Sequence, residues 1–202
     1  HYGKSVMEIL NDQFSNLGNG LGYNIWTERL NAMDYGVPEN RERVFIVGIR
    51  NDLNLKWNCP PKEKSAHLTI KDAISDLPEV LEGQSISSYQ QLPQNKYQEL
   101  MRHGSNELTQ HFCGCYSEKI RAVIQHVKQG EGKNEFNALV DSGKIDKSYR
   151  LTSGYANTYG RLIADQPSPT ITNNLTTVSS LRCIHSVSYT HLRAHETDQY
   201  LV

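Results

Sequence analysis

The sequence predicts an α/β fold at its start, followed by a smaller and irregular unit. Apolar residues recur at helical spacing in SVMEILNDQFSNLG, and two strand-like stretches follow it, which together predict the α/β part. The irregular unit is predicted because residues 83–106 are rich in Gln, Ser and Asn and lack apolar periodicity. We therefore expect units at residues 1–55, 56–148 and 149–185, with a tail at 186–202.

The first unit begins with a helix, which Ser5 can cap and Gly18 can end. The next stretch, YNIWTERLNA, alternates between two faces and predicts a strand of mixed burial. After a turn over Tyr35–Asn40, the apolar run VFIVGI (Val44–Ile49) is typical of a strand buried on both faces. The link between the strands is short, which predicts an antiparallel pair, because a parallel crossover needs about a dozen residues or more.

Regular structure is sparser in the later units. The sequence predicts a short helix over Thr69–Val80 that Pro78 ends, and a second amphipathic helix over Ser117–Gly130. Strand and turn material, with aromatic residues and a Pro-Ser-Pro corner, fills Tyr149–Asn174. We interpret the two tryptophans as core or hinge residues rather than as platforms on which bases stack: Trp26 and Trp57.

Composition narrows the class of protein without identifying it. The net charge of −1 gives no overall basic field of the kind that marks many nucleic-acid-binding modules, although a cleft can still be locally basic. No apolar run approaches the roughly 20 residues that a membrane-spanning helix needs, and no signal segment is recognisable. Reduced thiols are therefore expected at the four cysteines: Cys59, Cys113, Cys115 and Cys183. The absence of an initial Met is compatible with processing or with a truncated reading frame.

Two arginines, Arg41 and Arg43, precede the second strand and are one residue apart. Alternation along a strand places both on one face, at a sheet end of the kind where α/β folds bind ligands. A guanidinium is always charged and carries five donors in a rigid fork, which suits a phosphate or a base carbonyl. The alternative is a solvated ion-pair cluster formed by these arginines and Glu42.

Two long motifs resemble conserved blocks of one enzyme family. LNAMDYGVPENRERVFIVGIR resembles the eighth block of the DNA (cytosine-5) methyltransferases, and YGRLIADQPSPTITNN resembles their ninth block. The opening HYGKSVMEIL is similar to the helix that follows their Glu-Asn-Val block. The resemblance spans about residues 4–185. It implies the C-terminal part of a Rossmann-like S-adenosylmethionine-dependent methyltransferase (1–55), a small irregular target-recognition domain (56–148) and a return toward the catalytic domain (149–185).

The same resemblance implies an activity. Enzymes of this family transfer a methyl group from S-adenosylmethionine to C5 of cytosine in a specific duplex DNA sequence, commonly within a restriction–modification system. The positions that match Arg41 and Arg43 help to hold the target cytosine and the catalytic loop. The family usually has Gln where this chain has Glu39, which puts that residue's contact with DNA in doubt. The nucleophilic cysteine, the catalytic glutamate and the cofactor loop have no counterparts here, so we expect this chain alone to be inactive and the cofactor to be bound mainly by missing N-terminal parts.

Further partners and residues follow from the resemblance. Within Leu151–Asn174, Arg161, Thr170 and Thr172 are the candidates for positioning the recognition segment or touching DNA. Double-stranded DNA is the expected partner, a cognate restriction endonuclease a possible one, and a monomer in the cytoplasm of a bacterial or phage-infected cell the expected state. Two alternatives stay open: an RNA (tRNA) cytosine-5 methyltransferase, and a DNA-binding module without catalysis.

Two stretches could be misread as metal sites. Cys113 and Cys115 lie near His103 and His111, but one intervening residue is fewer than structural zinc sites commonly use, so a structured corner is favoured and no metal is expected. Residues 187–202 (VSYTHLRAHETDQYLV) resemble a translated sequencing-library adapter rather than the family's arginine-rich helix start. Its two histidines, at positions 191 and 195, are then accidental, and a divergent helix is the alternative.

Overall fold

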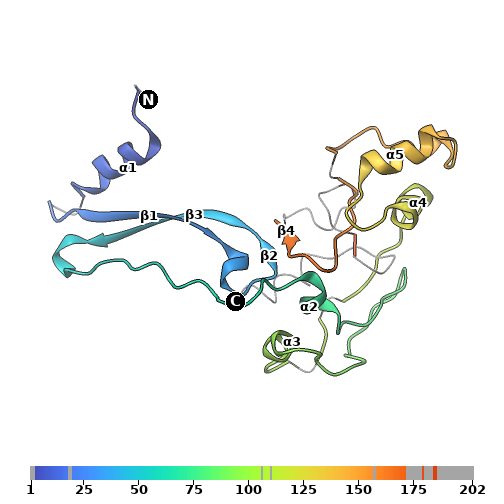
Figure 1. Ribbon diagram of the computed structural model, residues 1–202, viewed down its shortest axis with the longest axis horizontal. Coiled ribbons are helices and arrows are strands. Elements are labelled where there is room, and N and C mark those ends of the chain that lie inside the picture. Colours follow the sequence, from blue (N-terminus) through green and yellow to red (C-terminus); the bar gives the residue numbers. More distant parts are fainter. Residues whose placement is uncertain are drawn as a thin grey trace.

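The computed structural model describes residues 3–17, 20–105, 107–109, 111–156, 158–171, 179, 184 and 185. The chain forms a mixed α/β structure with two arms (Figure 1). The hairpin arm contains α1 (Val6–Phe14), β1 (Tyr23–Asn31) and β3 (Glu42–Arg50). The helical arm contains α2 (Ile70–Ile74), α3 (Lys96–Met101), α4 (Glu118–His126) and α5 (Lys133–Asp141). The short strands β2 (Glu39–Asn40) and β4 (Ser168–Pro169) pair in parallel where the arms meet.

The hairpin arm has the antiparallel pairing that the sequence predicts. β1 and β3 are in register from Tyr23↔Arg50 to Asn31↔Glu42. Ser5 caps α1 in a reciprocal capping box, also as predicted, but the helix ends at Phe14, before Gly18. Gly22 joins α1 to β1 at a φ of 63°, and a Cβ there would lie 2.3 Å from the Ser15 carbonyl oxygen. This close turn therefore requires glycine.

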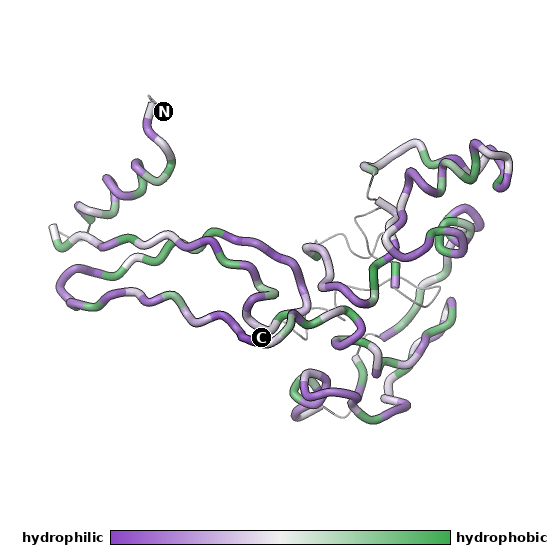
Figure 2. Tube along the Cα trace, viewed as in Figure 1, coloured by the Kyte–Doolittle hydropathy of each residue, from purple (hydrophilic) through white to green (hydrophobic). Residues whose placement is uncertain are grey.

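The prediction that β3 is buried on both faces is wrong for the described part of the chain. Val44 is 60%, Phe45 49% and Ile46 46% exposed. β1 is the only strand that pairs with β3 among the described residues. Figure 2 shows hydrophobic stretches along the hairpin. An apolar run predicts that a strand will be buried, but it does not identify the part of the protein that buries it.

The main hydrophobic core lies in the helical arm, between α4 and α5. Ser117 caps α4, which starts where the sequence predicts it, but the helix ends at His126, short of Gly130. The core includes Val123, Ile124, Val127, Phe136, Val140, Ile145, Leu151, Tyr159 and Ile184. Ile184 is fully buried, so the end of the return segment packs into this core. The helix α5 was not predicted from the sequence.

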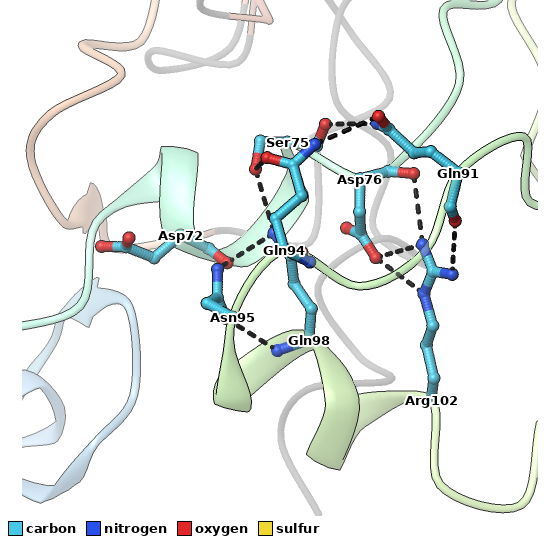
Figure 3. A network of polar contacts seen from close by, with 8 residues as sticks. All are labelled: Asp72, Ser75, Asp76, Gln91, Gln94, Asn95, Gln98 and Arg102. Carbon is cyan, nitrogen blue, oxygen red and sulfur yellow. Dashed lines mark hydrogen bonds and ion pairs between the residues drawn. The ribbon is translucent and has the colours of Figure 1, made fainter.

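A network of polar side chains joins α2 to α3 (Figure 3). The buried Gln98 amide donates to the Asp72 carbonyl oxygen at 2.9 Å. Arg102 pairs with the buried Asp76 and lies 3.6 Å from the centroid of the Tyr89 ring. The predicted helix over residues 69–80 is shorter than expected, and α3 lies inside the stretch predicted as irregular. Glutamine and asparagine here satisfy buried backbone groups, which explains why this unit needs few apolar residues.

Within the described residues, none of the helices has the length and apolar character that crossing a membrane requires.

Candidate functional site

The site begins with the backbone of Arg41, which lies between β2 and β3. Asn31, at the end of β1, fixes this backbone with its side chain: its Oδ1 accepts from the Arg41 amide at 3.0 Å and from the Met33 amide at 3.3 Å. Its Nδ2 donates to Asn40 Oδ1 at 2.7 Å. One asparagine therefore ties the hairpin end, the following 3-10 helix and β2 together, and sets the direction in which the arginines leave the backbone.

The two arginines have different surroundings. Arg41 Nη1 donates to the Ile171 carbonyl oxygen at 3.2 Å and lies 3.4 Å from Glu39 Oε1. The Glu39 side chain is 4% exposed and the Arg41 side chain 35% exposed. Arg43 is exposed, and its Nη1 donates to the Glu42 carbonyl oxygen at 2.7 Å. Arg41 is thus held between the arms, whereas Arg43 presents its remaining donors to solvent.

The alternative of an ion-pair cluster within residues 41–43 does not describe this arrangement. The Glu42 carboxylate pairs with Arg29 on the neighbouring strand, and the carboxylate beside Arg41 belongs to Glu39. Arg43 contacts Glu42 through the main-chain carbonyl. The two guanidinium groups are therefore not neutralised by the acidic residue between them.

A cavity of about 380 Å³ lies between the hairpin and the chain that follows it. It is lined by Leu30, Asn31, Ala32, Tyr35, Arg41, Arg43, Phe45, Trp57 and Pro60. Three lining residues are aromatic, and none carries a thiol or a carboxylate. The indole Nε1 of Trp57 is buried without a hydrogen-bond partner among the described residues. An unpaired buried donor is costly unless a ligand or water satisfies it.

Asp34 holds the segment that forms one wall of this cavity. Its carboxylate accepts from Lys62 Nζ at 2.7 Å and contacts His67 Nε2 at 3.1 Å. Its carbonyl oxygen accepts from the Glu63 amide at 2.8 Å. The hydrogen bond from Lys62 is the largest of the effects that lower the pKa of Asp34 below its ordinary value. Residues 62–67 are therefore tied to the 3-10 helix after β1, and the intervening Trp57 and Pro60 stay beside the hairpin.

The return segment (residues 149–185) also contacts the site. The Ser168 amide donates to the Pro38 carbonyl oxygen at 2.8 Å, and Thr170 Oγ1 donates to the Asn40 carbonyl oxygen at 3.2 Å. Thr170 thus lies next to the arginine pair, bound to the main chain of β2. Thr172, the other predicted threonine, lies outside the described residues.

Arg161 lies away from the cavity, inside the helical arm. It is 6% exposed. Its guanidinium donates to the carbonyl oxygens of Val127 at 2.7 Å, His185 at 2.7 Å and Ile124. These contacts tie α4 to the end of the return segment. The structure therefore brings Arg41, Arg43 and Thr170 together and places Arg161 elsewhere.

The two cysteines that were predicted to lie in a structured corner differ in burial. Cys113 is buried, and its thiol lies 3.4 Å from the Tyr116 hydroxyl, whereas Cys115 is exposed. Among the described residues, no three His, Cys, Asp or Glu side chains gather into a group that could hold a metal ion. The tail at 186–202, with both of its histidines, lies outside the described residues.

The geometry suits recognition of a flat, partly apolar group that carries hydrogen-bond acceptors. Aromatic walls can stack on such a group, and the two guanidinium groups supply fixed donors at the rim. The lining provides two guanidinium groups and no carboxylate, and the Glu39 carboxylate lies 3.4 Å from Nη1 of one of them, Arg41. Sequence reasoning missed Asn31 and Asp34. Their positions at the end of a strand and in a turn are the only signals that could have indicated them.

The sequence matches the model of one protein family, described as C-5 cytosine-specific DNA methylase, over residues 1–192. The match extends into the start of the adapter-like tail. Among curated proteins, the chain is 37% identical over 132 residues to the type II methyltransferase M.DdeI of Desulfomicrobium norvegicum, covering 62% of this chain and 31% of that protein. It is 28% identical over 180 residues to the type II methyltransferase M1.HgaI of Avibacterium volantium, covering 89% and 42%.

Solved structures contain a similar fold. A protein described as a DNA modification methyltransferase encoded within a prophage (E. coli) matches with a TM-score of 0.64 at 17% identity, over 98% of this chain and 55% of that chain. At this identity the likeness concerns the fold. The chain spans less than two thirds of the length of these relatives.

Proposed function

The chain belongs to the C-5 cytosine-specific DNA methylases, and we propose that it provides one rim of the active site and the target-recognition part of such an enzyme. In this proposal the complete enzyme transfers a methyl group from S-adenosylmethionine to C5 of cytosine in a specific duplex sequence. Residues 1–55 belong to a Rossmann-like catalytic domain, 56–148 form the target-recognition domain, and 149–185 return toward the catalytic domain.

The observation that carries the proposal is the aromatic cavity with Arg41 and Arg43 at its rim. A cytosine must leave the duplex before its C5 can react, and this costs a few kcal/mol of stacking and pairing. A pocket that stacks on the extruded base and binds its carbonyl or its phosphate with arginine offsets part of that cost.

S-adenosylmethionine supplies the methyl group in this proposal, bound mainly by parts of the enzyme outside this chain. The exposed guanidinium of Arg43 at the rim supports this division, because it would repel a sulfonium beside it. The chain's own contribution is to hold and orient the target base. It contains no match to the family's nucleophile block, so we expect no methyl transfer by the 202-residue chain alone.

DNA contacts in this proposal come from the helical arm and from the junction. In this proposal Thr170 contacts the DNA backbone near the target base or holds β2 in position, and Thr172, which lies outside the described residues, stays a candidate for contact with DNA. Arg161 contributes by tying the return segment to α4, since its guanidinium is already bonded to main-chain carbonyls. Contacts to phosphates orient such a complex, while contacts to base edges read the sequence.

The relatives named as type II methyltransferases support a restriction–modification setting. We propose a bacterial or phage enzyme that works as a monomer on DNA in the cytoplasm, with a cognate endonuclease encoded nearby. The family description names DNA, which favours duplex DNA over tRNA as the substrate.

The test begins with a long sequence read across the source locus, followed by expression of the complete enzyme. Transfer of a tritiated methyl group to duplex DNA and not to tRNA is expected. Arg43→Ala should lower kcat/KM by about 100-fold, because it removes a donor from the charged rim. The matched control is Arg50→Ala on the same strand, where the side chain pairs with Asp52. Methylation of tRNA alone, or equal activity of the two variants, would refute the proposal.

A further inference from the structure

Glu39 is a buried acidic residue at the point where the two arms join. It is 3% exposed, in a segment where the acidic neighbour Glu42 is exposed. Buried carboxylates are rare unless their oxygens are bonded. Here Oε1 accepts from the Ile171 amide at 2.8 Å. The partner is a main-chain group 132 residues away in the sequence.

The contact continues a strand pairing that the backbone cannot extend. The parallel pairing of β2 and β4 ends at Asn40↔Pro169. Beyond it, the two main-chain polar groups of Ile171 bond to side chains: the amide donates to Glu39, and the carbonyl oxygen accepts from Arg41 Nη1 at 3.2 Å. The Glu39 and Arg41 side chains therefore make the two hydrogen bonds to the Ile171 main chain that a neighbouring strand would otherwise make.

The distances separate two explanations for the acidic residue. Oε1 lies 2.8 Å from the Ile171 amide nitrogen but 3.4 Å from Arg41 Nη1. The first is a good hydrogen bond, and the second is at the outer limit of one. Of the two hydrogen bonds to Oε1, the one from the Ile171 amide is therefore the better formed.

We propose that Glu39 is a positioning residue: its acceptor oxygen fixes Ile171, and the Ile171 carbonyl in turn fixes the guanidinium of Arg41. As a role in catalysis this rests on the proposed function, because it orients the arginine at the rim of the cavity. The contact that Glu39 makes between the arms does not depend on the proposed function, so the contact and the role in catalysis can be measured separately. Gln keeps the reach of the acceptor and loses the charge, whereas Asp keeps the charge and is one methylene shorter.

The first experiment measures hydrogen exchange of the Ile171 amide by NMR in the 202-residue chain. Glu39→Gln should keep most of the protection of this amide, and Glu39→Asp should raise its exchange rate about tenfold, as loss of one hydrogen bond predicts. Glu42→Gln is the matched control, since it also removes a carboxylate but one that pairs with Arg29. Equal protection in the Gln and Asp variants, whether kept or lost, overturns the proposal, as does stronger protection in the Asp variant.

The second experiment follows the position of Arg41 by its reaction with a dicarbonyl reagent that modifies arginines. The rate at Arg41 should rise several-fold in Glu39→Asp and stay unchanged in Glu39→Gln. Arg161 is the internal control, because it is buried and becomes reactive only when the helical arm unfolds. A rise at Arg41 without a rise at Arg161 supports the positioning role. Parallel changes at both arginines would mean general destabilisation and would overturn it.

These readouts need neither DNA nor cofactor. If the exchange and modification results are as expected but the complete enzyme does not methylate DNA, the contact stands and the proposed function fails. If the enzyme is active and Glu39→Asp leaves the exchange rate of the Ile171 amide unchanged, the proposed function stands and this inference fails.

Discussion

Arg161 illustrates how the burial of a side chain changes the role expected of it. An arginine in a recognition segment suggests contact with a phosphate, but here the guanidinium is enclosed and bonded to carbonyls of Val127, Ile124 and His185. Those acceptors are up to 37 residues away, so the sequence around Arg161 cannot identify them. Its role as a DNA-binding residue stays a prediction, and its burial favours the positioning role.

Replacing Arg161 should destabilise the helical arm strongly. Arg161→Met should lower the free energy of unfolding by about 3 kcal/mol, because carbonyls that lose charge-assisted donors stay buried. Urea denaturation followed by circular dichroism measures this. Arg121→Met is the matched control, since Arg121 pairs with Glu82 and its side chain is 45% exposed. A similar small loss in both variants would contradict the structural role of Arg161.

Asp34 should make the cavity wall sensitive to acid. Its pKa is lowered, with the hydrogen bond from Lys62 the largest cause, so the carboxylate stabilises the folded state at pH values above its ordinary pKa of 3.8. This contribution is lost as the pH falls below 3.8 through the folded-state value. Trp57 fluorescence in a Trp26→Phe background should report loosening of the wall. In Asp34→Asn, Trp57 should already show at pH 7 the fluorescence that the unsubstituted protein shows only in acid. The same pH dependence of Trp57 fluorescence in the two proteins would exclude this role of Asp34.

At the scale of elements, helix starts were easier to predict than helix ends or short helices. Ser5, Thr69 and Ser117 all cap helices in the structure. α5 was missed because its N-cap is Gly132, which has no side chain to bond the first turn. The ends of α1 and α4 come earlier than their glycines suggest, since a glycine permits a stop but does not set where the last helical hydrogen bond forms.

Two capping boxes allow a comparison of the same motif in different surroundings. Thr69 caps α2, whose residues Ile70, Ala73 and Ile74 are buried, whereas Ser5 caps α1, which has no buried residue. Thr69→Ala should therefore cost about 1 kcal/mol of unfolding free energy. Ser5→Ala should reduce protection of α1 amides without moving the unfolding midpoint of the helical arm. Equal shifts of that midpoint would contradict the view that α1 is independent of the core.

The pair β1 and β3 was predicted correctly in order, direction and approximate extent, and wrongly in burial. Local alternation and a short link fix the pairing, and both are properties of the sequence itself. Burial depends on what else lies over the sheet. In the proposed complete enzyme the rest of the catalytic domain would cover β3.

The exposed strand should make the isolated chain associate. Val44 and Ile46 lie on the same face of β3, and an exposed apolar strand is a common site of self-association. The double variant Val44→Thr, Ile46→Thr should lower the weight-average mass measured by light scattering while keeping the strand, since Thr favours β structure. Val6→Thr is the control, because Val6 is 72% exposed but lies on α1. A monodisperse unsubstituted chain would contradict the prediction.

For the whole molecule, the sequence predicted an α/β segment followed by an irregular one, and it placed the arginine pair at the end of a strand. It did not predict that the two segments form separate arms, or that Glu39 and Thr170 would bond across the junction. The junction pairs only two residues from each side, which is too short for any periodicity. Its specificity lies in side chains such as Asn31 and Glu39, whose partners become apparent only once the chain is folded.

The pairing of β2 with β4 also has a consequence for the time course of folding. The hairpin arm is built from neighbours in the sequence, while the junction joins groups 130 to 132 residues apart. Closing so long a loop carries an entropic cost that few contacts repay at once. We therefore expect the hairpin arm to acquire its structure early and the junction to close late. Until it closes, Arg41 lacks its bond to the Ile171 carbonyl oxygen, so under the proposed function a newly made chain would become able to hold a base only at a late step of folding.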